Sequence, residues 1–278
     1  MIHAYQLVVL APYAAALVLV AIPGYRVGAV LNVLASAATL AAGLWLMVGE
    51  GTVGEYAIVD EFNVVFIVIN TLVGFTTALF SASYIGHEIE TGRLSPGFVR
   101  FYHAMFQAMM GSMNVALIAN NIGVMWVAIE LATLTTVLMV GIYRTHEALE
   151  AAWKYFILGS VGIALALFGT ILVYMAARPV IGEGLDAMTW TVLVTRADAF
   201  DPALLNVAFV FLLLGYGTKV GLAPLHAWLP DAHAEGPTPI SAVLSGLLLN
   251  VALYALLRFK MLLALNPAAL APGPLMVT

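Results

Sequence analysis

Two ionisable residues lie within apolar segments of the chain, and their types suit proton transfer. Glu130 is near the middle of NNIGVMWVAIELATLTTVLMV, and Lys219 precedes Pro224 by about a turn and a half of helix. A charge in a bilayer is costly, so such residues face the interior of a helix bundle and often mark ion pathways. An amine beside a carboxylate changes its proton affinity when the carboxylate moves. The alternative interpretation is an inert pair that locks two helices together.

Lys219 lies near the start of an unusual stretch, GTKVGLAPLHAWLPDAHAEGPTP, which covers residues 217 to 239. Each of its four prolines removes a backbone donor, so a continuous helix through 221 to 239 is not expected. Non-helical backbone inside a membrane requires burial in protein or contact with water. The sequence therefore predicts an interruption at about 222–238, either within the bilayer or as a surface loop.

Three further groups of polar residues are candidates for a role in proton movement. Lys154, in ALEAAWKYFILGS, is either buried at the start of its helix or extends to the membrane interface. His226 is a candidate proton relay at the break; with Asp231 and His233 it could instead bind a metal, although a relay or a structural role needs fewer coincidences. Two polar stripes either line a water-filled route or bond helices to one another: His103, Gln107 and Asn114, and Asn63, Asn70, Thr77 and Ser81.

The elements that must position these residues are membrane-spanning helices. Hydrophobic residues make up 63% of the 278 residues and charged residues 9%, far outside the usual range of soluble domains. The apolar start, MIHAYQLVVLAPYAAALVLV, lacks a basic leader and is interpreted as a retained first helix. The absence of cysteine excludes iron–sulfur ligation by cysteine and thiol chemistry by this chain. The sequence has no cluster of basic residues, so nothing in it suggests binding to nucleic acid. We expect an all-α polytopic bundle in the lipid bilayer, with no cofactor and no metal.

The distribution of charge predicts the topology. Apolar segments lie at about 6–22, 27–48, 62–85, 101–120, 122–142, 151–176, 203–221 and 239–260. With the N-terminus outside, five basic residues fall on the cytoplasmic side, as the positive-inside rule requires: Arg26, Arg93, Arg100, Arg144 and Lys154. Arg258 and Lys260 join them only if 203–260 crosses the membrane once in total, as two half-helices around the break.

Several segments resemble a known family. The run TKVGLAPLHAWLPDAHAEGPTPISAVLSGLLLNVALYALLRFK, with WVAIELATL and AAWKYFILGS, is similar to the antiporter-type membrane subunits of respiratory complex I, Mrp cation/proton antiporters and membrane-bound hydrogenases. The sequence over residues 100 to 260 is most similar to the hydrogenase-4 component F branch of that family. The first three helices match only in hydropathy.

The resemblance implies proton translocation by a coupled glutamate on the fifth helix and lysine on a discontinuous seventh helix, which match Glu130 and Lys219. It also places Lys154 at a family lysine on the sixth helix. The implied organisation is N-terminal helices 1–3 in residues 1–100 and an incomplete first repeat, helices 4–7, in 101–278. Family members carry a second, inverted repeat that this chain lacks, and Ser245 stands where the largest such subunit of complex I has a histidine.

We therefore expect a proton-translocating inner-membrane subunit of a redox-driven complex, either of the hydrogenase-4/formate-hydrogenlyase type or of the NADH:quinone oxidoreductase type. Its partners would be other membrane subunits, including one that supplies the second repeat. The alternatives are a Na⁺/H⁺ antiporter module, a partner of an inorganic-carbon transporter and a non-transporting scaffold. The chain has no redox site of its own, so catalysis by this subunit alone is not expected.

Overall fold

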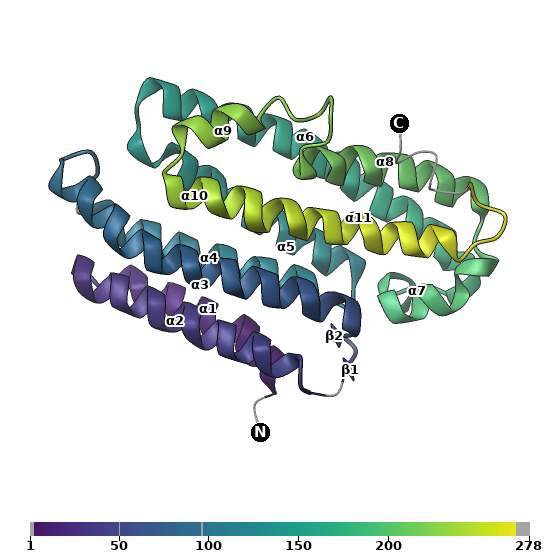
Figure 1. Cartoon of the computed structure of the whole chain (residues 1–278). Coiled ribbons are helices and arrows are strands. Elements are labelled where there is room, and N and C mark those ends of the chain that lie inside the picture. Colours follow the sequence, from purple (N-terminus) through teal and green to yellow (C-terminus); the bar gives the residue numbers. More distant parts are fainter. Residues whose placement is uncertain (1–2, 50, 96, 271–278) are drawn as a thin grey trace.

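The computed structural model of the chain describes residues 3–49, 51–95 and 97–270, and almost all of them are helical (Figure 1). The helices are α1 (Ala4–Ala21), α2 (Tyr25–Leu46), α3 (Glu61–Glu90), α4 (Gly97–Ile118), α5 (Ile122–Val140), α6 (His146–Ile181), α7 (Trp190–Arg196), α8 (Pro202–Val220), α9 (Leu229–Glu235), α10 (Thr238–Val243) and α11 (Leu249–Ala264), with a π-helical turn, Leu244–Leu248, between the last two. A short hairpin of β1 (Thr52–Val53) and β2 (Ile58–Val59) precedes α3. The expected all-α fold is confirmed.

Seven of the described helices are long and apolar enough to cross a membrane: α1, α2, α3, α5 with its following turn, α6, α8, and the continuous helix from α10 to α11. They lie roughly parallel or antiparallel to one another, with α4 packed among them (Figure 1). Their outward faces are rich in exposed leucine, valine and phenylalanine, which suits contact with lipid. The chain is a multi-pass membrane protein.

The bundle has two ends, an α9 end and an α7 end. At the α9 end, helices α4 and α6 begin and helix α5 ends; at the opposite, α7 end, α5 and α8 begin (Figure 1). The α7 end is tied together by Asn120, whose side-chain amide donates to the carbonyl oxygen of Gly54 over 2.7 Å and whose own carbonyl accepts from the backbone of Trp190 over 2.8 Å. The β-hairpin, the start of α5 and α7 therefore meet at one place.

Helices α6 and α8 pack closely because small residues line their contact. A Cβ atom on Gly162 would lie 2.8 Å from the Cβ of Thr218, and one on Gly215 would meet the backbone nitrogen of Ala166. Without side chains at these positions the two backbones approach closely, as is common between membrane helices. The α6–α8 seam fixes the helix that carries Lys219 against α6.

The interruption predicted from the prolines is present. Helix α8 ends at Val220 and is capped by Gly221, whose φ of 78° is a left-handed conformation that glycine adopts readily. No residue from Gly221 to Trp228 is helical. The short helix α9 follows, and Gly236 and Pro237 separate it from α10. The seventh helix is thus discontinuous, with α8 before the break and the short α9 after it. The division of the chain near residue 100 stays a prediction.

The prediction that 203–260 crosses the membrane once in total is wrong. Helix α8 and the helix from α10 to α11 are each long enough to cross, and they run in opposite directions (Figure 1). Arg258 consequently lies at the α7 end, where it is buried and its guanidinium is 2.6 Å from Asp60 Oδ2. Counting Arg258 as a free loop charge failed because this arginine is neutralised by a partner 198 positions away in sequence.

The two polar stripes bond helices to one another. Asn70 donates to Asn114 over 2.7 Å between α3 and α4, and the Ser81 hydroxyl lies 2.8 Å from that of Tyr102. Gln107 donates to the side chain of Asn32 over 2.8 Å and to Ser36 over 2.9 Å, joining α4 to α2. Interhelical hydrogen bonding therefore accounts for much of the stripes, although among the described residues no hydrogen-bond partner is found for the buried His103 ring.

Candidate functional site

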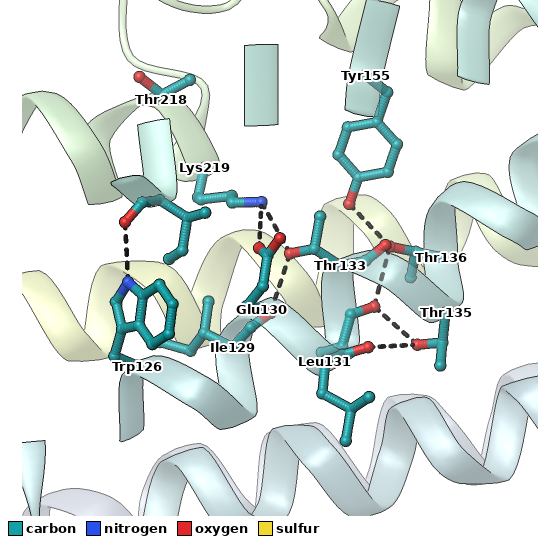
Figure 2. Close-up of polar contacts among 12 residues, drawn as sticks. Trp126, Ile129, Glu130, Leu131, Thr133, Thr135, Thr136, Tyr155, Thr218 and Lys219 are labelled. Carbon is teal, nitrogen blue, oxygen red and sulfur yellow. Dashed lines mark hydrogen bonds and ion pairs between the residues drawn. The ribbon is translucent and has the colours of Figure 1, made fainter. Parts of the chain in front are cut away.

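Lys219 is fully buried two residues before the break, with 0% of its surface exposed. Its Nζ lies 3.5 Å from Glu130 Oε2 and donates to Thr133 Oγ1 over 2.9 Å (Figure 2). Gly159 on α6 leaves room for the ammonium group, since a Cβ atom there would lie 3.0 Å from Nζ. The two ionisable residues singled out from the sequence thus form an ion pair between α5 and α8.

The environments of the two partners differ. The Glu130 side chain is 20% exposed, whereas the side chain of Lys219 is 1% exposed. Part of the Glu130 side chain therefore reaches the edge of the bundle, although its Oε2 is buried, while the ammonium lies between helices. Burial of a charge requires a partner and hydrogen bonds, and the ammonium has both. Because Thr133 lies one turn from Glu130 on the same helix, both partners of Lys219 belong to α5.

A line of polar and aromatic side chains connects this pair to the break. The hydroxyl groups of Thr136 and Tyr155 are 2.8 Å apart (Figure 2). The Tyr155 ring stacks on Trp228 with centroids 4.6 Å apart, and the indole nitrogen of Trp228 donates to the carbonyl oxygen of Thr218 over 2.8 Å. Trp228 is the last residue of the non-helical stretch. The break thus contacts the helix that carries Lys219 and the wall beside the pair.

Sequence reasoning did not identify Tyr155 or Trp228. Both are aromatic residues in apolar surroundings, so the sequence gives no sign of their contact. The one available signal was the position of Tyr155 directly after Lys154 at the start of α6.

Lys154 and His226 are both away from the buried pair. Lys154 is half exposed at the α9 end, and its Nζ is 2.8 Å from both Glu150 Oε1 and Asp231 Oδ2. It therefore ties α6 to α9. His226 is exposed on the non-helical stretch.

The residues considered for a metal have other partners. Asp231 pairs with Lys154, and His233 Nδ1 lies 2.6 Å from the hydroxyl of Ser241. Within residues 3–49, 51–95 and 97–270 no group of three potential ligands comes together. Burial lowers the pKa of His233, which favours the neutral imidazole at that hydrogen bond.

A second ion pair occupies the α7 end. The Arg258 guanidinium carbon lies 5.1 Å from the ring of Phe62, 5.2 Å from that of Trp190 and 5.1 Å from that of Tyr254. Together with Asp60 these rings hold the arginine in place. The arrangement joins α11, α3 and α7, which is a structural role.

The fold and the site define a class: a polytopic helical membrane protein with a buried lysine–carboxylate pair beside a broken helix. Residues 119–272 match the family described as "NADH:quinone oxidoreductase/Mrp antiporter, TM". The chain belongs to this family, and the resemblance inferred from the motifs is confirmed.

Two curated relatives agree with this assignment. The hydrogenase-4 component F homolog of Methylacidiphilum infernorum is 62% identical over 269 residues, which cover 97% of this chain and 56% of that protein. The NADH-quinone oxidoreductase subunit N of a Paenibacillus species is 32% identical over 160 residues, 57% of this chain and 30% of that protein. The chain thus spans about half the length of the first relative, and less of the second.

Solved structures show the same fold. A chain of the membrane-bound sulfane sulfur reductase, an archaeal respiratory membrane complex, superposes with a TM-score of 0.83 at 20% identity and covers 98% of this chain and 55% of that one. A chain of respiratory complex I from Thermus thermophilus gives a TM-score of 0.74 at 24% identity, covering 99% and 55%. Both neighbours are parts of multisubunit membrane complexes.

Proposed function

We propose that this chain is a proton-translocating membrane subunit of a redox-driven complex, of the hydrogenase-4/formate-hydrogenlyase or NADH:quinone oxidoreductase type. The observation that carries the proposal is the buried Lys219–Glu130 pair, because an intramembrane ion pair marks an ion pathway more often than a structural lock. The family and the names of the relatives support the redox-driven setting. With no cysteine in the sequence, electron transfer is assigned to partner subunits.

In this mechanism the ammonium of Lys219 loses its charged partner, Glu130, and later regains it. A charge that arrives from a neighbouring subunit displaces Glu130, and the electrostatic support of the ammonium falls. The hydrogen bond to Thr133 holds the amine in place during this step. The lysine then releases its proton and recovers it when Glu130 returns.

Protons reach the pair from the α9 end in this proposal. The non-helical stretch from Gly221 to Trp228 supplies backbone groups that water can solvate, and His226 is exposed there to exchange protons with it. From Trp228, the Tyr155 and Thr136 hydroxyl groups lead toward Thr133. Lys154 positions this entrance by tying α9 to α6, which is its proposed role.

The exit of the proton pathway is proposed to lie in protein outside these 278 residues. The chain spans about half of its relative, so a second repeat, in the same polypeptide or in another, is proposed to provide the exit. The proposed location is the inner membrane with the N-terminus outside, which places Arg26, Arg93, Arg100 and Arg144 in the cytoplasm.

The test uses inverted membrane vesicles that contain the assembled complex. Lys219→Met and Glu130→Gln are compared with Lys260→Met, a control at a lysine outside the pair, and acidification is measured together with electron transfer. We expect the first two variants to lose acidification driven by electron transfer, while the control keeps it. Normal acidification by both pair variants would refute the proposal. Acidification that requires Na⁺ would instead support the antiporter alternative.

A further inference from the structure

A cavity of about 750 Å³ opens at the α9 end, between the start of α4, the end of α5 and the start of α6. Its walls are aromatic and aliphatic, with Phe98, Phe101, Leu138, Trp153 and Phe156 among them, and none of the described residues that line it is acidic. Several of these side chains are exposed on the surface of the bundle, so the cavity faces the membrane. The buried pair and the break do not use it.

Arg144 is the basic residue in the lining of this cavity. Arg144 occupies the turn between α5 and α6, where its guanidinium carbon lies 4.3 Å from the centre of the Phe98 ring. The backbone of Arg144 has a φ of 57°, a left-handed conformation that is uncommon for residues other than glycine. No carboxylate pairs with this guanidinium in the described part of the chain. The turn thus presents a positive charge, steadied by an aromatic ring, at the mouth of an apolar cavity.

The dimensions of the cavity fit a lipid chain better than a partner helix. The lining runs from Leu134 on α5 to Gly141 in the turn that follows, eight residues, or about 10 Å along the helix axis. A transmembrane partner would need a groove along most of α5, but this cavity stops one turn before Glu130. Its cation lies where the chain turns back at the end of the bundle, the depth at which phospholipid headgroups lie.

We propose that the cavity binds an anionic phospholipid, with Arg144 holding the headgroup phosphate and one acyl chain lying against Leu138, Trp153 and Phe156. Arginine suits this role because its guanidinium forms charge-assisted hydrogen bonds with phosphate oxygens. A smaller cavity of about 270 Å³ on the other side of Phe101 is lined by Arg100. That residue supplies a second cation beside the same aromatic wall.

Lipid in this cavity would reach the neighbourhood of the ion pair. Leu134 lies one helical turn from Glu130 on α5, so the inner end of the acyl chain would cover the helix surface next to the partly exposed Glu130 side chain. The bound lipid would then limit water at Glu130 from the membrane side. This consequence rests on the proposed function, whereas lipid binding itself does not.

Native mass spectrometry of the purified full chain tests the binding. Phosphatidylglycerol and phosphatidylcholine with the same acyl chains are added in turn to the wild type and to three variants. The loss of one basic contact at the bilayer surface lowers affinity about fivefold, so Arg144→Gln should reduce phosphatidylglycerol binding by that factor and remove the preference over phosphatidylcholine. Leu138→Trp fills the cavity and should reduce binding of both lipids. Arg26→Gln, an exposed arginine at the same end, is the control and should change neither.

Two outcomes would overturn the proposal. One is equal binding of the two lipids by the wild type, or an equal loss in Arg26→Gln and Arg144→Gln, since either would show non-specific attraction. The other comes from Leu138→Cys in the assembled complex, where it would be the only cysteine of this chain. Cross-linking of that cysteine to another polypeptide, and not to a photoactivatable phosphatidylglycerol, would assign the cavity to a protein partner. Because none of these measurements depends on transport, failure here leaves the proposed function untouched.

Discussion

Replacing Glu130 with Gln leaves the fully buried ammonium of Lys219 without its countercharge. At the observed 3.5 Å and an effective dielectric constant of about 20, the attraction between the two charges is about 5 kcal/mol. The glutamate side chain is 20% exposed, and solvent screens part of this energy. The Thr133 hydrogen bond also remains in the variant. We therefore expect Glu130→Gln to lower the free energy of unfolding by about 3 kcal/mol.

A second substitution separates this electrostatic effect from a packing defect. Adding Lys219→Met to Glu130→Gln removes the stranded charge and puts an apolar side chain in an apolar site, so most of the lost stability should return. The assay is equilibrium unfolding of the purified chain in mixed detergent micelles, followed by circular dichroism. If the double variant is no more stable than Glu130→Gln, the two groups do not form the coupled pair on which the mechanism depends.

Three further predictions concern the surroundings of the pair. Gly215→Ala should lower stability by about 2 kcal/mol or more in the same unfolding assay, because the new Cβ would meet the backbone of Ala166 and no side-chain movement can relieve that contact. Tyr155→Phe should cost about 1 kcal/mol, because it removes the hydrogen bond to Thr136 and keeps the aromatic ring. The pKa of His233 is lowered by burial, so the unfolded chain takes up this proton at a higher pH than the folded chain, and stability should fall as the pH drops below about 6.5.

Each of these predictions has a control. Gly28→Ala makes the same chemical change inside a helix, where the nearest atom to a new Cβ would be a His103 ring carbon at 3.4 Å, an ordinary contact, and it should not lower stability. Tyr254→Phe also removes a buried hydroxyl, one that donates to Leu117 over 2.9 Å and accepts from Arg258 over 2.9 Å. A loss at Tyr155 as large as the loss at Tyr254 would show that more than the Thr136 hydrogen bond is affected. His233→Gln should flatten the pH dependence; an unchanged slope would assign it to another group.

The helices and the break were predictable from the sequence because both are local properties. Apolar runs of sufficient length specify spans, and prolines exclude a continuous helix wherever they occur. The side-chain partners were less predictable. Lys154 meets Asp231 across 77 positions, and Arg258 meets Asp60 across 198. No local pattern encodes such contacts, which is why a topology based on loop charges misplaced the last helix.

The pairing of Glu130 with Lys219 came from a resemblance, and the geometry agrees with it. Periodicity alone placed each residue within a membrane span but left open which helix it would face. For His226 the position in the chain was predictable, but the orientation of its side chain was not. Its position in the break was evident from the sequence, but a loop prediction does not decide whether a side chain points inward, and this one is exposed.

The glycine-lined seam between α6 and α8 has a mechanical consequence. Two backbones in direct contact at Gly215 and Gly162 leave little freedom for one helix to slide or roll against the other. Lys219 is therefore carried by a helix that is held in place against α6. A movement that separates the ion pair would have to come from α5, which carries both Glu130 and Thr133.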